Sequence, residues 1–182
     1  PYEVIPGVSA AFAAAAVVKK ELTLPGVSQT VIIGRRAGRT PVPEGQDIPS
    51  LAAHGATLAL YLSVGDMEGL VDELVQGGYA PNTPVALVYR ATWPDEKVLE
   101  GTLSDIAAKA KEAGITRQAL VLVGHALSGD GEESLLYAPH FSHGYRQSKS
   151  EVSNMGAGDV PLLVSRGDYR VAQRAKPLSA HV

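Results

Sequence analysis

The residues best suited for chemistry near the start of the chain follow a Pro-Gly turn. A β-branched stretch leads into Pro6 and Gly7, and Ser9 then precedes an alanine-rich segment. This order predicts the end of a strand, a tight turn and a helix that Ser9 caps. The free N–H groups of a first helical turn and the Ser9 hydroxyl group can bind a polar ligand. A purely structural turn between strand and helix is the alternative.

Regular elements alternate along the chain after this turn. Apolar or alternating stretches predict strands, and segments with helical spacing and polar ends predict helices. The predicted strands are residues 2–5, 29–35, 57–62, 84–89, 97–101 and 119–123, and the predicted helices are residues 9–20, 47–54, 67–76 and 103–113. Thr102 is expected to cap the last helix, with Asp105 three residues later. The alternation predicts an α/β fold, and the hairpin-like residues 97–101 indicate a mixed sheet flanked by helices.

Composition narrows the classes of function. The chain has 182 residues, of which 45% are hydrophobic, and a net charge of −3. We expect no nucleic-acid partner because no basic stripe is present, and no membrane partner because no apolar run reaches the roughly 20 residues that span a bilayer. The absence of cysteine suits a cytoplasmic protein. His140 and His143 are the only close pair among five histidines, and we interpret them as surface residues rather than metal ligands.

A series of short motifs in a fixed order indicates the family. The motifs occupy residues 4–10, 21–33, 35, 38–44, 54–63, 83–88, 91–94, 122–124, 136–139 and 141–146. Together they resemble the tetrapyrrole (corrin/porphyrin) methyltransferase family. Residues 39–44, Arg-Thr-Pro-Val-Pro-Glu, are most similar to its precorrin-4 C11-methyltransferase branch. The resemblance extends over residues 1–147.

The resemblance implies an enzyme that uses S-adenosylmethionine to methylate a corrin precursor, precorrin-4 at C11, in cobalamin biosynthesis. The sulfonium group of this cofactor is already an activated leaving group. The reaction therefore needs alignment and exclusion of water, and we assign no catalytic residue. One alternative is a sister methylase that acts on uroporphyrinogen III or another precorrin, and another is a non-catalytic lobe or remnant. The resemblance is compatible with a homodimer.

Four residues match positions at which the family contacts its cofactor. Ser9 and Ala10 correspond to the pair beside the methionine part of S-adenosylmethionine. Leu62 stands where the family often has a methionine near the adenine, and Ala91 stands at a backbone contact to the adenine. An apolar wall of this kind would suit a flat purine. The ends of core strands are the alternative interpretation of Leu62 and Ala91.

Arginines are expected to hold the substrate, because tetrapyrrole precursors carry many carboxylates and a guanidinium group binds a carboxylate with two donors. Arg35 and Arg39, with Arg36 between them, cluster beside residues 40–43, whose two prolines stiffen the loop. A solvated surface loop is the alternative. The family usually has threonine where this chain has Gly34, which leaves the contacts of the loop open.

The family fold has two lobes. The Gly-x-Gly-Pro-Gly loop and the Gly-Asp-Pro segment of the first lobe do not occur in this sequence. We expect residues 1–20 to be the end of a truncated N-terminal lobe and residues 21–147 to be the C-terminal lobe of the two-lobed tetrapyrrole methylase fold. Residues 148–182 form a tail of unknown structure. We expect the chain to be inactive alone.

Overall fold

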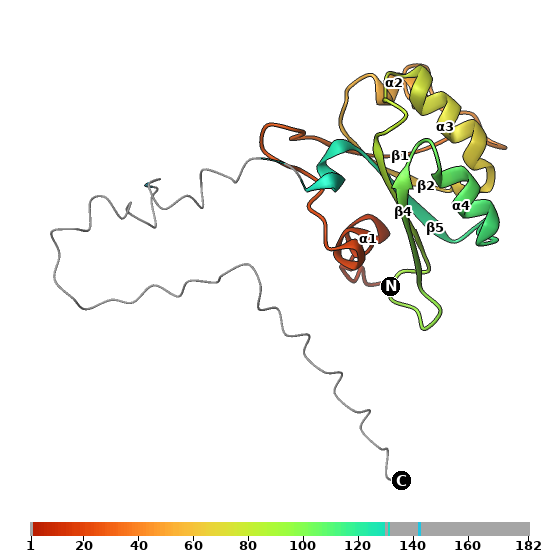
Figure 1. Ribbon diagram of the computed structural model, residues 1–182. Helices are drawn as coiled ribbons and strands as arrows, with labels where there is room; N and C mark the ends of the chain where they lie inside the picture. Colours follow the sequence, from red (N-terminus) through yellow and green to blue (C-terminus); the bar gives the residue numbers. More distant parts are fainter. Residues whose placement is uncertain (1, 130, 132–141, 143–182) are drawn as a thin grey trace, which may run out of the picture. The chain divides into compact units, whose positions relative to one another are not determined.

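In the described part of the chain, five strands form one mixed sheet (Figure 1). The computed structural model describes residues 2–129, 131 and 142. The strands lie side by side in the order β1 (Val31–Arg35), β2 (Thr57–Tyr61), β5 (Ala119–Val123), β3 (Pro84–Tyr89) and β4 (Lys97–Thr102). β1 and β2 are parallel, and the other neighbouring pairs are antiparallel. The predicted α/β class with a mixed sheet is confirmed.

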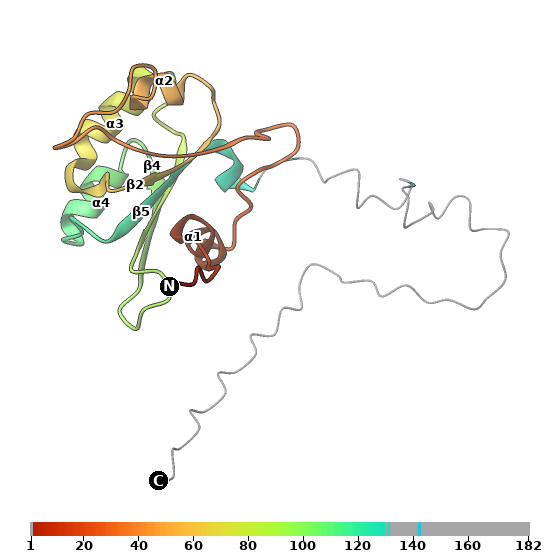
Figure 2. The ribbon, with the colours of Figure 1, turned by 180° about the vertical axis from the view of Figure 1, so that it is seen from behind.

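Three helices cover one face of this sheet. They are α2 (Ile48–Ala52), α3 (Met67–Gln76) and α4 (Ile106–Glu112), and they lie on the same side in both views (Figures 1 and 2). Successive side chains of a strand point to opposite faces, so alternate residues of β2, β5 and β3 meet these helices. The buried residues of this layer include Leu58, Leu60, Leu70, Leu74, Val85, Leu87, Ile106, Val121 and Val123.

The opposite face packs against α1 (Ala10–Val18) (Figure 2). Ala11 and Ala14 are fully buried there, together with Ala59 of β2 and Leu122 of β5. Small side chains on both surfaces let the helix approach the strands closely. The alanine-rich composition of this segment therefore follows from its position on the sheet. A short 3₁₀ helix, η2 (His125–Ser128), contributes Leu127 to the same layer.

Residues 2–5 do not form the predicted strand. They belong to no helix or strand, and Tyr2, Val4 and Ile5 are exposed by at least 80%. A strand requires a neighbour that accepts and donates its backbone hydrogen bonds. None of the described strands lies beside this segment, so the β-branched pattern has no pairing partner here.

Thr102 does not cap α4 as predicted. It is the last residue of β4, where pairing with Pro84 of β3 keeps it extended. Asp105 precedes α4 instead, and its carboxylate accepts a hydrogen bond from the Thr102 N–H group at 2.8 Å. The expected link between the two residues is present, but the helix begins three residues later than predicted, at Ile106.

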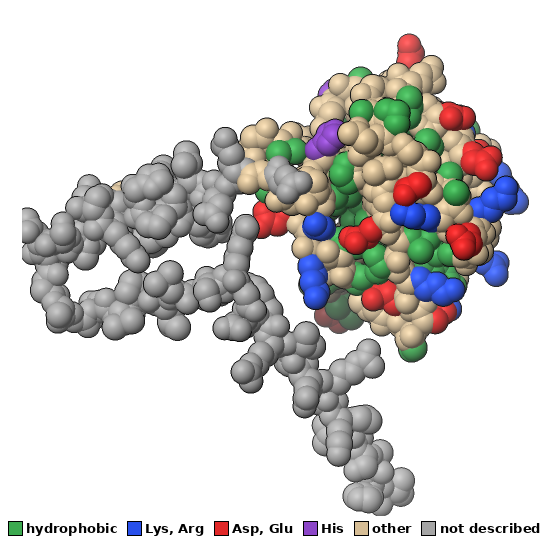
Figure 3. All heavy atoms as spheres, viewed as in Figure 1, with side chains coloured by type: hydrophobic (Ala, Val, Ile, Leu, Met, Phe, Trp, Pro, Cys, Tyr) green, Lys and Arg blue, Asp and Glu red, His purple; other side chains and the backbone are tan. Residues whose placement is uncertain are grey.

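The chain divides into two units, Pro1–Ala138 and Pro139–Val182. The motifs after residue 135, His140, His143 and the tail predicted at 148–182 fall outside the described residues, apart from Ser142. The lobe boundaries at residues 20 and 147 stay predictions. Within residues 2–129, none of the helices has the length and apolar character needed to cross a bilayer. On the face shown in Figure 3, basic and acidic side chains are interspersed.

Candidate functional site

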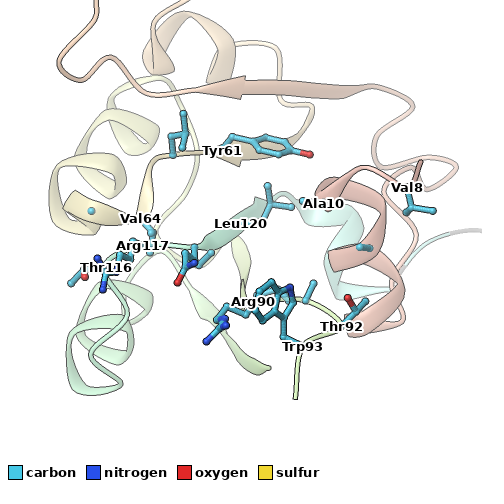
Figure 4. Close-up of a pocket in the computed structure, with 17 residues that line it drawn as sticks. Val8, Ala10, Tyr61, Val64, Arg90, Thr92, Trp93, Thr116, Arg117 and Leu120 are labelled. Carbon is cyan, nitrogen blue, oxygen red and sulfur yellow. The ribbon is translucent and has the colours of Figure 1, made fainter. Parts of the chain in front are cut away.

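A cleft of about 580 Å³ opens where β2 and β3 end and β5 begins. Antiparallel pairing creates this meeting point, because Leu60 lies opposite Val121 and Tyr89 lies opposite Ala119. The loops after β2 and β3, the loop before β5 and the first turn of α1 form the walls (Figure 4). The lining residues are Val8, Ala10, Ala13, Tyr61, Leu62, Val64, Gly65, Val88, Arg90, Ala91, Thr92, Trp93, Thr116, Arg117, Gln118, Ala119 and Leu120.

Three of the four predicted cofactor residues line this one cleft. Ala10 comes from α1, Leu62 directly follows β2, and Ala91 comes from the loop after β3. Ser9 stands beside the cleft, and its hydroxyl oxygen lies 2.5 Å from the hydroxyl oxygen of Tyr61, which does line it. The fold thus brings together positions that are up to 82 residues apart, since 91 − 9 = 82. The cofactor role of these residues stays a prediction.

Strained backbone is concentrated around the cleft. Leu62, Arg90, Thr92 and Gln118 have φ angles of 53°, 49°, 71° and 58°, in the left-handed region that residues other than glycine rarely adopt. All four line the cleft, and the remaining described non-glycine residue with a positive φ, Lys19, ends α1. Such conformations cost on the order of 1–3 kcal/mol each and gather at functional sites.

Backbone hydrogen bonds hold two of these strained loops together. The N–H group of Arg90 donates to the carbonyl group of Gln118 at 3.0 Å, and the N–H group of Trp93 donates to the carbonyl group of Arg90 at 3.0 Å. The Arg90 guanidinium group lies 4.2 Å from the centroid of the Trp93 ring and pairs with Asp95 at 2.5 Å. These contacts fix the conformation of the loop after β3, which forms one wall of the cleft.

Sequence reasoning did not identify several residues of this cleft. Residues 116–118 form a short connector between α4 and β5, and nothing in their sequence separates them from an ordinary turn. Trp93 lies in the motif at residues 91–94. A single tryptophan soon after a core strand is a signal that the following loop is part of a site. Tyr61 could not be assigned, because its role depends on a contact with a helix 50 residues away.

The described lining contains no aspartate, glutamate or histidine. Its polar side-chain groups are hydroxyl groups, one amide, the indole N–H group of Trp93 and the guanidinium groups of Arg90 and Arg117. Among residues 2–129, no group of three histidine or carboxylate side chains is arranged to hold a metal ion. The cleft is therefore suited to binding a flat, partly apolar ligand with polar edges, and the phenol of Tyr61 is the one described lining group of a kind used in general acid–base catalysis.

Arg35 lines a second groove, of about 450 Å³, which Tyr61 also lines. Its guanidinium group donates to the carbonyl groups of Arg36, Thr40 and Pro41 at 3.3, 3.2 and 2.9 Å. Arg35 thus closes the loop that follows β1. Arg39 is exposed on this loop and makes no hydrogen bond or ion pair to a described residue. Neither arginine lines the first cleft, and their predicted role in substrate binding stays a prediction.

Arg36 has a separate role, as an anchor between the end of β1 and α3. It pairs with Asp66 at 2.5 Å and with Glu73 at 2.9 Å. The hydrogen bond to Glu73 is the main reason that the pKa of the Arg36 guanidinium group is raised, and Asp66 adds to it. The same contact with Arg36 lowers the pKa of the Asp66 carboxyl group. Because both carboxylates pair with it, the Arg36 guanidinium group has a structural role.

Comparisons with known proteins agree with this geometry. The family model for tetrapyrrole (corrin/porphyrin) methylases matches residues 1–107. The cobalt-precorrin-4 C(11)-methyltransferase of Methanocaldococcus jannaschii is 52% identical over 147 residues, which cover 80% of this chain and 57% of that relative. The chain thus spans little more than half of the length of this curated relative.

Two solved structures are similar as well. A cobalt precorrin-4 methyltransferase of cobalamin biosynthesis is 46% identical, with a TM-score of 0.67 over 69% of this chain and 52% of that one. The uroporphyrin-III C-methyltransferase of Thermus thermophilus, solved with S-adenosyl homocysteine, is 27% identical, with a TM-score of 0.54 over 71% of this chain and 55% of that one. From motifs, fold and relatives alike, this chain belongs to the family of tetrapyrrole (corrin/porphyrin) methylases.

Proposed function

We propose that this chain forms the adenine-binding part of an S-adenosylmethionine-dependent methyltransferase that acts in the cytoplasm. The observation that carries the proposal is that Ala10, Leu62 and Ala91 line one cleft whose loops hold four left-handed residues. Backbone strain of this kind persists where a ligand site requires it. A similar structure that was solved with S-adenosyl homocysteine supports the choice of cofactor.

The chemistry of methyl transfer agrees with the residues of the cleft. When bound, S-adenosylmethionine would supply the activated methyl group on its sulfonium. The protein then has to hold the reacting atoms in line and keep water away, which apolar walls and shaped loops can do. Leu62 and Ala91 would pack against the adenine, and Ser9 and Ala10 would lie beside the methionine part. No acid or base from the described lining is needed.

We propose precorrin-4, methylated at C11, as the substrate of the complete enzyme. Identity supports this choice over a sister methylase: 52% and 46% to the two precorrin-4 enzymes, against 27% to the uroporphyrin-III enzyme. Arg39 is the proposed first contact to a substrate carboxylate, since its guanidinium group is exposed and unpaired among the described residues. The Arg35 guanidinium group would contribute those of its N–H groups that do not already donate to carbonyl groups of its own loop.

Titration of the 182-residue chain with S-adenosyl homocysteine, followed by NMR, tests the proposed cofactor site. We expect the largest shifts at the amide groups of Leu62, Ala91 and Gln118. Shifts confined to other surfaces would reject the site.

Catalysis is tested in a chimera in which the matched part of this chain replaces the corresponding segment of the Methanocaldococcus jannaschii relative. We expect methylated product from cobalt-precorrin-4, detected by mass spectrometry. A folded chimera that binds the cofactor product but forms no methylated tetrapyrrole would instead identify this lobe as non-catalytic. Methylation of uroporphyrinogen III in preference to cobalt-precorrin-4 would identify the sister activity.

A further inference from the structure

The hydroxyl group of Tyr61 performs the capping that the sequence assigned to Ser9. The Ser9 side chain makes no capping hydrogen bond to α1. Instead, the N–H group of Ala11, in the first turn of α1, donates to the Tyr61 hydroxyl oxygen at 2.9 Å. The Ser9 hydroxyl oxygen lies 2.5 Å from the same atom. Figure 4 shows the Tyr61 ring directed from the end of β2 toward the beginning of α1, where Ala10 lies. One tyrosine therefore joins two walls of the cleft.

The backbone that follows Tyr61 is held by the side chain of Ser63. The Ser63 hydroxyl group donates to the Tyr61 carbonyl group at 2.8 Å and accepts a hydrogen bond from the Arg36 N–H group at 3.0 Å. Ser63 is only 3% exposed, so this contact is shielded from water. Arg36 continues the network to α3 through Asp66.

Leu62 stands between these two anchors. Its φ of 53° is unfavourable for a branched side chain, and its side chain is 86% exposed on the cleft. A strained residue keeps its conformation only when its surroundings over-determine it. Here Tyr61 is tied to α1, and Ser63 is tied to β1 and to the Tyr61 carbonyl group. The two neighbours together impose the turn that presents Leu62 to the cleft.

We infer that Tyr61 is a positioning residue of the cofactor site: its hydroxyl group sets Ser9 and Ala10 at a fixed distance from Leu62. The inference rests on the proposed function, because Ser9, Ala10 and Leu62 are the expected contacts to the methionine and adenine parts. Tyr61 acts through these residues, because its hydroxyl group accepts a hydrogen bond from the Ala11 N–H group and contacts the Ser9 hydroxyl group.

The test compares Tyr61→Phe with Tyr79→Phe in the full 182-residue chain. Tyr61→Phe keeps the ring on the cleft wall and removes only the hydroxyl group. We expect the dissociation constant for S-adenosyl homocysteine, measured by NMR titration, to rise about three- to tenfold, as for the loss of one hydrogen bond. Amide hydrogen exchange of Ala11 should also become faster.

Tyr79→Phe is the matched control. Its buried hydroxyl group donates to the Ala56 carbonyl group, and Tyr79 does not line the cleft. We expect this variant to lower the melting temperature and to leave the dissociation constant unchanged, which separates positioning from general stability. An unchanged dissociation constant in Tyr61→Phe, while the unsubstituted chain binds at Leu62 and Ala91, would overturn the positioning role and leave the proposed function intact. An unsubstituted chain in which millimolar S-adenosyl homocysteine shifts only amide groups outside the cleft would overturn both.

Discussion

At the scale of single residues, the cleft is defined by backbone conformation rather than by reactive side chains. Leu62 and Thr92 adopt left-handed φ angles in the loops that follow β2 and β3, and both residues are exposed. Ala91 lies beside Thr92 and leaves space that a larger side chain would fill. These positions give the cleft a fixed shape, which the proposed methyl transfer requires because it depends on alignment of the reacting atoms.

Replacing Ala91 with Phe should fill the proposed adenine pocket. We expect the dissociation constant for S-adenosyl homocysteine to rise at least about tenfold, which corresponds to about 1.4 kcal/mol. The fold should persist, because Ala91 faces a cleft. Ala80→Phe, at an exposed position outside the lining, is the control and should bind as the unsubstituted chain does. Equal affinity in a folded Ala91→Phe variant would reduce this loop to a structural role.

The two candidate substrate arginines should respond differently to replacement. Arg39→Ala in the chimera should weaken tetrapyrrole binding by about 1.5–3 kcal/mol, the range for hydrogen bonds to charged groups, with little change in melting temperature. Arg39→Lys should restore part of the loss, since it keeps the charge without the planar fork. Arg35→Ala should lower the melting temperature, because it releases three loop carbonyl groups. Unchanged tetrapyrrole affinity in Arg39→Ala would mean that other groups hold the carboxylates.

At the scale of elements, strand order creates the site. β5 lies between β2 and β3 and runs antiparallel to both, so its first residues meet the last residues of its two neighbours. Three loops and the first turn of α1 thereby surround one space. The ion pairs of Arg36 with Asp66 and Glu73 hold α3 against the end of β1, close to the Ser63 contact that fixes the loop after β2.

The contact between Arg36 and Asp66 should give stability a dependence on pH. The pKa of the Asp66 carboxyl group lies below its ordinary value of 3.8, chiefly because Arg36 donates a hydrogen bond to it and secondly because the Gly69 N–H group does. A group whose pKa is lower in the folded state stabilises the fold above the unfolded pKa, and this contribution disappears as the pH falls through the folded pKa. Asp66→Asn should therefore unfold at lower urea concentration than the unsubstituted chain near neutral pH.

The difference in urea midpoint between Asp66→Asn and the unsubstituted chain should shrink as the pH falls below about 4. Asn can still cap α3 through its side-chain oxygen, so the variant isolates the effect of charge. Asp72→Asn, on the same helix and without an ion pair to a described residue, should show no such pH-dependent difference. A difference for Asp66→Asn that stays constant down to low pH would show that the charge of this carboxylate does not contribute.

At the scale of the whole molecule, the three central strands, β2, β5 and β3, are buried on both faces while the cleft stays open to the surface. Three helices cover one face and α1 covers the other. Leu62 and Trp93 nevertheless remain 86% and 55% exposed. The curated relative of Methanocaldococcus jannaschii has further sequence beyond the matched 57% of its length.

We expect the 182-residue chain to bind S-adenosyl homocysteine no more tightly than about 1 mM. The described walls bury too little of a ligand to offset the entropy that it loses on association. The chimera with the relative should bind more tightly. Calorimetry that gives micromolar affinity for the chain alone would contradict this expectation and show that the lobe described here encloses the cofactor by itself.

Local patterns in the sequence were sufficient for most of the secondary structure and for the family. Short apolar runs located β2, β3 and β5, because a strand buried on both faces is apolar along its length, and alternation located β1, each to within about two residues. The same patterns failed at residues 2–5, where a strand-like composition has no partner among the strands that the structure describes. Motif order also selected Ala10, Leu62 and Ala91, which the fold then brings to one cleft.

Only the tertiary structure decided the roles that depend on contacts between distant residues. Three arginines, Arg35, Arg36 and Arg39, have the same side chain in the sequence, yet one closes its own loop, one pairs with α3 and one is exposed. Ser9 is a residue type that favours the N-cap position, but the Tyr61 hydroxyl group, at the end of β2, accepts the hydrogen bond from the first turn of α1. A local pattern specifies what a segment can form, whereas its partners depend on strand order, and strand order depends on the burial of the whole sheet.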